Sequence, residues 1–129
     1  MAILDDGAGN LILYAGDSGY ITFELEGIEP GLNCRAYFSI YNEDGKQIGD
    51  QIQSTNFGGE IVKFFISSQL TNLLKTQGIQ EPSTYYYGVK LCYTDAQGEI
   101  IENTLDIEKG EIGSLNTVTV YPKKTEGDE

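Results

Sequence analysis

The chain contains no histidine among its 129 residues. Histidine is the commonest general base at neutral pH and a frequent metal ligand, so its absence removes the usual route to acid–base or metal-assisted catalysis. The segment Gly16-Asp17-Ser18-Gly19 has the letters of a serine-nucleophile motif. Without a histidine to take its proton, Ser18 has no base to activate it, and we interpret the segment as a turn. We therefore expect no catalytic residues and a protein that is not an enzyme.

Cysteine is almost as scarce, because the chain has only Cys34 and Cys92. Their separation does not match the spacing of metal ligands, and we expect two free thiols. The alternative is a disulfide between neighbouring strands, which would indicate an oxidising compartment. The acidic groupings near residues 5–10 and 43–50 lack the spacing of a calcium-binding loop. No phosphate-binding glycine motif is present either, so we expect no metal site and no cofactor.

Basic residues are few: 8 Lys and Arg stand against 20 Asp and Glu, which gives a net charge of −12. A chain without a basic stripe does not suit a nucleic-acid backbone or an anionic membrane surface, so we expect neither partner. Acidity keeps a domain soluble, and it also fits a basic protein partner. The sequence also lacks an apolar run of 18 residues, and Met1–Asp6 has no basic start, so we expect no membrane span, no secretion signal and synthesis in the cytoplasm.

What the chain has in abundance is the alternation of a half-buried strand. The clearest case is Ser83–Thr94, followed by the hairpin turn Asp95-Ala96-Gln97-Gly98 and a returning strand from Glu99. The large residues of this strand alternate with smaller or more polar ones, and we expect the large set to be core. That set is Tyr85, Tyr87, Val89, Leu91 and Tyr93.

The same alternation of apolar and polar residues recurs along the chain. It predicts strands over residues 11–14, 20–26, 34–42, 46–53, 60–66, 99–107 and 116–121. A serine followed by leucines at helical spacing predicts a short helix near residues 67–75. Together these elements indicate an all-β fold, an antiparallel immunoglobulin-like β-sandwich of about 7–9 strands. We expect one domain over residues 11–121, a flexible N-terminal segment at 1–10 and a frayed polar tail at 122–129.

Tyrosine is the one compositional hint of function, with nine copies and no tryptophan. The alternation places Tyr20, Tyr37, Tyr41 and Tyr86 on outward faces, and exposed tyrosines favour protein interfaces or sugar stacking. We predict that these four residues contribute to partner binding. The alternative is that tyrosine is a good strand former whose hydroxyl simply reaches water.

The order of these segments resembles the small immunoglobulin-like domains of phage and prophage tail proteins, in particular the N-terminal domain of baseplate upper proteins. The segments that carry the resemblance are Gly16–Leu25, Ala36–Tyr41, the helix-like Ser67–Leu74 and Ser83–Leu91. The resemblance implies a non-enzymatic virion component that binds copies of itself, as a homo-oligomer, or neighbouring tail proteins.

Two other hypotheses remain open from the sequence. The outward tyrosines fit a carbohydrate- or cell-surface-binding module, and the charge fits a small acidic inhibitor that docks on a basic host protein.

Overall fold

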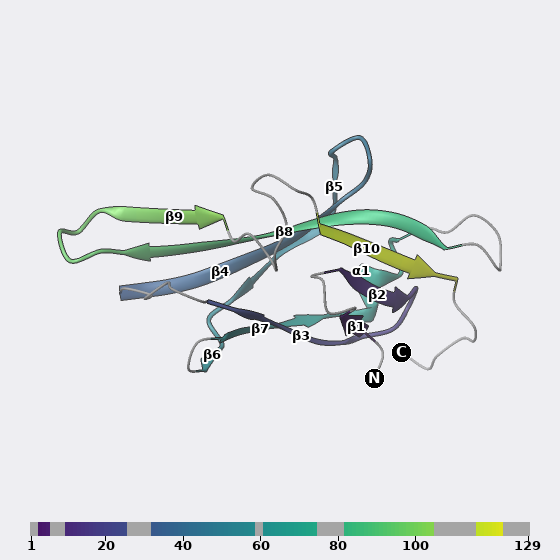
Figure 1. Cartoon of the computed structure of the whole chain (residues 1–129), viewed down its shortest axis with the longest axis horizontal. Helices are drawn as coiled ribbons and strands as arrows, with labels where there is room; N and C mark the ends of the chain where they lie inside the picture. The colour runs from purple at the N-terminus through teal and green to yellow at the C-terminus, as the bar shows by residue number, and fades with distance from the viewer. Residues whose placement is uncertain are drawn as a thin grey trace.

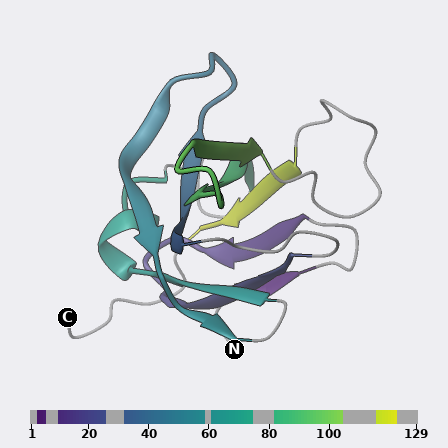
Figure 2. The same cartoon turned by 90° about the vertical axis from the view of Figure 1, so that its left-hand side faces the viewer.

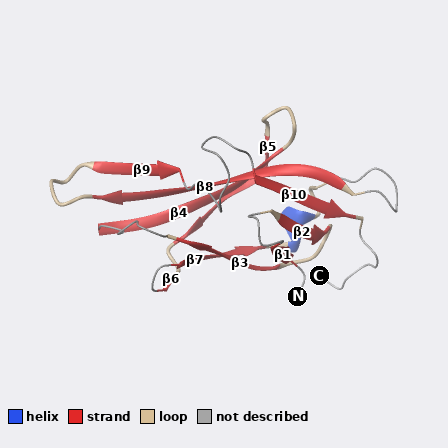
Figure 3. Cartoon of the chain, viewed as in Figure 1, coloured by secondary structure: helices blue, strands red, loops and turns tan. Residues whose placement is uncertain are grey.

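The computed structural model of the chain describes residues 3–5, 10–25, 32–58, 61–74, 82–104 and 116–122. These residues form an all-β sandwich with one short helix, as expected, and Figures 1 and 3 show its two layers of strands. In the large sheet the spatial order is β1 (Ile3–Asp5), β2 (Leu11–Tyr14), β10 (Asn116–Tyr121), β8 (Ser83–Thr94), β4 (Leu32–Tyr41) and β5 (Gln47–Ser54), and β9 (Ile100–Thr104) pairs with the second half of β8. In the small sheet the order is β3 (Gly19–Glu24), β7 (Ile61–Ile66) and β6 (Phe57–Gly58).

The prediction of a purely antiparallel sandwich is wrong at one place. Strand β10 pairs in parallel with β2, where Val118 faces Leu11 and Val120 faces Leu13, so the large sheet is mixed. Two parallel neighbouring strands need a long connection between them, and here residues 15–115 connect β2 to β10. The sequence pattern of each strand is the same for either direction, and alternation alone does not reveal this pairing.

The number and limits of the elements also differ from the prediction. Ten strands occur in the described residues, and the two additional ones, β1 and β6, are too short to give a visible alternation. Strand β1 pairs with β2 and places residues 3–5 in the sheet, before the domain boundary that we expected at residue 11. The end of the return strand predicted over 99–107 and the polar tail after Pro122 lie outside the described residues.

The predicted helix forms as α1 (Ser68–Thr71), within the expected range. Ser67 caps it, because its side-chain oxygen accepts a hydrogen bond from the backbone N–H of Leu70 at 3.1 Å. Thr71 is fully buried and donates its hydroxyl hydrogen to the carbonyl oxygen of Asp17 at 2.6 Å. This contact ties the helix to the turn before β3. Figure 2 shows β5 running down one side of the sandwich toward β6, and the backbone N–H of Lys63 on β7 donates to the carbonyl of Asn56.

The core lies between the two sheets and consists of the inward residues that the alternation predicts. The buried residues are Ile21, Phe23 and Leu25, then Ala36, Phe38 and Ile40, then Val62, Phe64 and Ile66, then Tyr87, Val89 and Leu91, and finally Val118 and Val120, with Leu11, Leu13, Leu70 and Leu74 beside them. Tyr85 and Tyr93 were expected in the core but are only partly buried at its edge. Tyr93 is the second-last residue of β8 and pairs with β9. Figure 1 shows this part of β8, with β9, extending past the small sheet, so less of the opposite layer covers it.

Candidate functional site: the tyrosine face of the large sheet

The outer surface of β4 and β8 carries three of the four tyrosines that the sequence marks as partner-binding candidates. Because Ala36, Phe38 and Ile40 point into the core, the residues that alternate with them on β4 point outward. The same rule applies to β8, where the residues between the buried Tyr87, Val89 and Leu91 point outward. We call this surface the tyrosine face. It comprises the outward residues of β4 between Arg35 and Tyr41 and of β8 between Tyr86 and Cys92, with their direct neighbours on β5, β9 and β10.

The strand register arranges the tyrosine face in four rows, about 7 Å apart along the strands. The first row holds Gln47, Tyr41, Tyr86 and Thr117; the second holds Ser39 and Gly88; the third holds Gln53, Tyr37, Lys90 and Thr104; the fourth holds Arg35, Cys92 and Glu102. Tyr41 and Tyr86 are thus directly opposite each other, and Tyr37 lies two rows away on the same strand as Tyr41. All three tyrosines are partly buried.

Tyr20, the fourth predicted residue, lies on the other layer of the sandwich. It is on β3 of the small sheet, 53% exposed, and pairs across the strands with Phe65, which is 48% exposed. The two ring centroids are 5.1 Å apart, and the Lys63 ammonium lies 4.5 Å from the centroid of the Tyr20 ring. The structure therefore separates Tyr20 from the other three candidates, and Tyr20 does not belong to the tyrosine face.

The second row of the tyrosine face has the smallest side chains. Gly88 has none, and a Cβ atom built on it would meet no other atom within 4 Å. Its register partner Ser39 is 4% exposed, and the Ser39 hydroxyl is buried without a hydrogen-bond partner in the described structure. Strand β5 gives Ser39 no register partner, because the register shifts between Phe38 and Ile40. The second row is therefore the part of the tyrosine face with the least side-chain volume, and it contains a buried polar group without a partner in the described structure.

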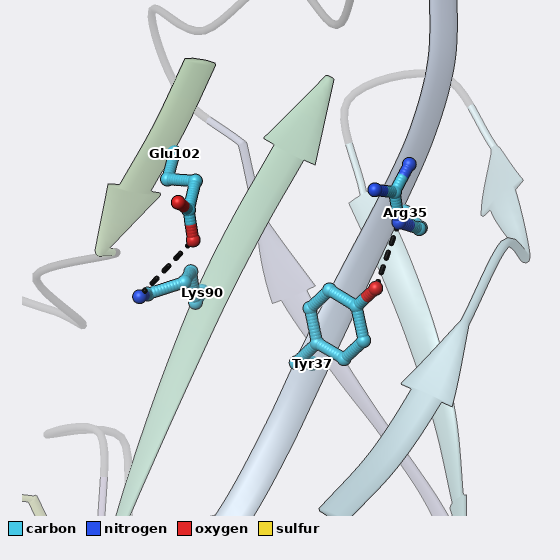
Figure 4. Close-up of polar contacts among 4 residues, drawn as sticks. All are labelled: Arg35, Tyr37, Lys90 and Glu102. Atoms are coloured by element: carbon cyan, nitrogen blue, oxygen red, sulfur yellow. Dashed lines mark hydrogen bonds and ion pairs between the residues drawn. The ribbon is translucent and has the colours of Figure 1, made fainter. Parts of the chain in front are cut away.

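Two polar contacts hold the third and fourth rows together, as Figure 4 shows. The Arg35 Nε donates to the Tyr37 hydroxyl oxygen at 2.7 Å, and an Arg35 terminal N–H donates to the backbone carbonyl of Asn33 at 3.0 Å. The hydrogen bond to Tyr37 raises the pKa of Arg35, so the guanidinium stays charged. The Lys90 ammonium makes an ion pair with Glu102 at 3.3 Å, and both side chains are well exposed. An exposed pair of this kind stabilises a fold by about 0–1 kcal/mol.

The two cysteines lie beside this end of the tyrosine face and are free thiols. Cys92 is buried in the fourth row, next to Arg35, although it lies on the outward side of β8. Burial raises the pKa of the Cys34 thiol, and the nearby Cys92 adds to the effect. The raised pKa favours the neutral form of the Cys34 thiol at neutral pH, which is the poorer nucleophile.

Sequence reasoning missed four residues of the tyrosine face: Ser39, Gly88, Arg35 and Lys90. One signal was present, because a glycine inside a strand of good β formers often marks a close approach of another chain or ligand. The other three had no signal in the local sequence. Their importance comes from pairing between β4 and β8, which lie far apart along the chain.

The unsatisfied hydroxyl leads to a stability prediction. Replacing Ser39 by alanine removes a buried polar group that has no partner, and we expect the free energy of unfolding to rise by about 1 kcal/mol. The matched control is Ser54, which is also buried but donates to the Lys63 carbonyl and accepts from the Asn56 N–H. Replacing Ser54 by alanine is expected to lower the free energy of unfolding by about 1–2 kcal/mol. Urea unfolding of both variants measures the difference, and a loss of stability in S39A equal to that in S54A would contradict the assignment.

Known proteins, metal-binding groups and membrane-spanning helices give no further information about the tyrosine face. No model of a known protein family and no curated protein matches the chain. Among the described residues, no group of three or more Cys, Asp or Glu side chains is placed to hold a metal ion. In the same part of the chain, no helix is long and apolar enough to cross a membrane.

Proposed function

We propose that this chain is a non-enzymatic interaction domain that binds a protein partner through the tyrosine face. The observation that carries the proposal is the register that brings Tyr37, Tyr41 and Tyr86 around the Ser39 and Gly88 pair. Tyrosine with serine and glycine is the composition of antibody paratopes, where rigid aromatic rings supply contact area and small polar residues adapt to the partner. Partly buried tyrosines also lose little side-chain entropy on binding.

The position of the face on the sandwich supports the same proposal. The face lies on two paired strands of ten and twelve residues, β4 and β8, whose other sides fill the core. A binding surface built on such strands is held in place by packing and needs little rearrangement to bind. By contrast, Tyr20 and Phe65 form a smaller aromatic patch on the three-stranded sheet.

The setting that we propose for this binding comes from the sequence resemblance alone. In this setting the chain is a phage or prophage tail or baseplate protein that is made in the bacterial cytoplasm and carried in the virion. Its domain has the immunoglobulin-like topology. In that setting the partner is a neighbouring tail protein or another copy of this chain. A carbohydrate ligand or a basic host protein is the competing outcome, and the identity of what the chain captures separates these cases.

The test compares capture of partners by the wild-type chain and by a variant in which Tyr37, Tyr41 and Tyr86 are all replaced by serine. Any protein that is captured is identified and purified, and its dissociation constant is measured for each variant. Because buried tyrosines at interface centres often contribute 2 kcal/mol or more, we expect the triple variant to bind about a hundredfold more weakly or worse. Circular dichroism verifies that the variant is folded, and sedimentation of the chain alone measures self-association.

The control is Tyr20→Ser, which removes an equally large but more exposed tyrosine from the other sheet. We expect this variant to bind as the wild type does. A partner that depends on Tyr20 and tolerates loss of all three tyrosines on the other sheet would contradict the proposal.

A further inference from the structure

We infer that the free edge of β3 pairs with the same edge of a second copy of this chain, in an antiparallel arrangement that joins the two small sheets into one. The inference goes beyond the proposed function, because it concerns the other layer of the sandwich and uses no residue of the tyrosine face. Three observations carry it: an unpaired strand edge, the direction of its backbone groups, and the charges beside it.

Strand β3 has one edge that is available for pairing. It is the first strand of the small sheet, and within the described residues β7 alone pairs with it. Strand β1 lies nearby, but its residues pair with β2. The outward side chains of β3 are Tyr20, Thr22 and Glu24, and all three are exposed. An exposed edge strand without proline is a ready template for a strand of another chain.

The contacts of Lys63 on β7 establish which backbone groups of β3 are free. The Lys63 N–H donates to the Asn56 carbonyl at 3.0 Å, and the Lys63 carbonyl accepts from the Ser54 hydroxyl, so both groups point to the side of β7 that faces β6. Thr22 is directly opposite Lys63, which makes the two a non-hydrogen-bonded pair. The N–H and C=O of Thr22 therefore point to the free edge of β3, and by alternation so do those of the residues two before and two after it.

These free groups define the register of the pair. A two-fold axis at Thr22 sets Thr22 against its own copy and Tyr20 against Glu24 of the second copy, and both are hydrogen-bonded pairs in an antiparallel ladder. Each free N–H and C=O of the three residues then has a partner. An axis at Ile21 or at Phe23 instead leaves one of the three residues opposite a residue outside β3.

The charges beside the edge favour a second copy as the occupant. In this register Glu24 of each copy faces the Tyr20 ring of the other, and the Lys63 ammonium lies 4.5 Å from the centroid of that ring. The one ion pair among the described residues joins Lys90 and Glu102, so neither Glu24 nor Lys63 has a partner of opposite charge in a single copy. The two-fold axis brings Glu24 and Lys63 together twice.

The net charge of −12 on each copy opposes this association. At physiological salt the screening length is about 8 Å, so most of the repulsion between the two copies is screened, while neighbouring charges still attract. We therefore expect the dimer to form at physiological salt and to weaken when the salt concentration is lowered. A basic protein on the same edge would show the opposite trend, because its attraction to the acidic chain would grow.

Sedimentation of the whole chain over a range of concentrations measures the dimer, and we expect a dissociation constant of about 10–100 μM for a contact of this size. Hydrogen exchange followed by NMR locates it. In dilute solution the amides of Tyr20, Thr22 and Glu24 should exchange fast, while those of Ile21 and Phe23 are protected by their bonds to β7. In concentrated solution the first three amides should become protected as well.

Two charge reversals separate a second copy from any other occupant. Glu24→Lys and Lys63→Glu each place like charges against each other at both contacts, and we expect each to weaken self-association about tenfold or more. Overall repulsion alone would predict tighter association of Glu24→Lys, because this change lowers the net negative charge. An equal mixture of the two variants restores opposite charges at both contacts, so the mixed dimer should form about as readily as the wild-type dimer.

The control is Lys46→Glu, in the exposed turn between β4 and β5, which changes the net charge by the same amount as Lys63→Glu. We expect it to dimerise as the wild type does.

Three outcomes overturn the inference: a chain that stays monomeric at millimolar concentration, a dimer in which the outward amides of β3 gain no protection, or a mixture that associates no better than its two variants alone. These failures are distinct from failure of the proposed function. A partner protein that depends on Tyr37, Tyr41 and Tyr86 would keep the proposed function even if β3 pairs with nothing.

Discussion

Replacing Phe38 by alanine is expected to lower the free energy of unfolding by about 3–5 kcal/mol, the largest effect of any single change considered in the core. Phe38 is almost fully buried at the centre of an aromatic cluster between the two sheets. Its ring centroid lies 6.2 Å from Phe23, 5.7 Å from Phe64 and 5.3 Å from Tyr87. Removing the ring loses these contacts and leaves a cavity bordered by both sheets, which the surrounding strands cannot easily close.

Thermal and urea unfolding measure this effect, and a drop in melting temperature on the order of 10–20 °C would accompany it. The control is Phe65→Ala, on the residue after Phe64 but on the exposed side of β7. We expect that variant to lose about 1 kcal/mol or less. Equal losses for the two phenylalanines would show that the core is not where the alternation and the structure place it.

Replacing Gly49 by valine is expected to lower the free energy of unfolding by about 2–4 kcal/mol, for two separate reasons. The φ angle of Gly49 is +71°, a conformation that β-branched residues rarely adopt. A Cβ atom at this position would also lie 2.5 Å from the Leu70 Cδ1 and 3.2 Å from the Leu73 Cδ1. Leu70 is buried, so it has little room to move. The glycine thus allows the irregular part of β5 to pack against α1.

The control separates backbone strain from the steric clash. Gly45 has a similar φ of +80°, but a Cβ atom there would meet nothing within 4 Å. Gly45→Val should therefore show the strain alone, about 1–2 kcal/mol. Urea unfolding of both variants gives the comparison. If Gly45→Val proved as destabilising as Gly49→Val, the contact between β5 and α1 would contribute nothing.

Local features of this fold were predictable because each depends on neighbours in the sequence. The alternation on β3, β4 and β7 gave the inward and outward sides correctly, since a strand has a period of two whatever it pairs with. The cap at Ser67 was visible for the same reason, because the capping bond spans three residues. Hence Tyr37 and Tyr41 could be assigned to one outward face before any pairing was known.

The candidate site itself was not predictable, because it depends on pairing between distant segments. Nothing in the alternation says that β4 pairs with β8, or that the register sets Tyr41 against Tyr86 and Ser39 against Gly88. A shift of two residues would preserve both faces and still separate these pairs. The parallel pairing of β2 with β10 was missed on the same grounds. Tyr20 was grouped with the others because alternation gives a side of a strand but not a layer of the sandwich.

The central claim, that the tyrosine face is where this domain binds its partner, is tested most directly by mapping the contact. A purified partner is added to the isotope-labelled chain, and amide shifts are followed by NMR. The account predicts changes centred on the rows of Ser39, Gly88 and Tyr37, with Tyr20 and Phe65 unchanged. Changes centred on Tyr20 and Phe65, with the four rows unaffected, would contradict it.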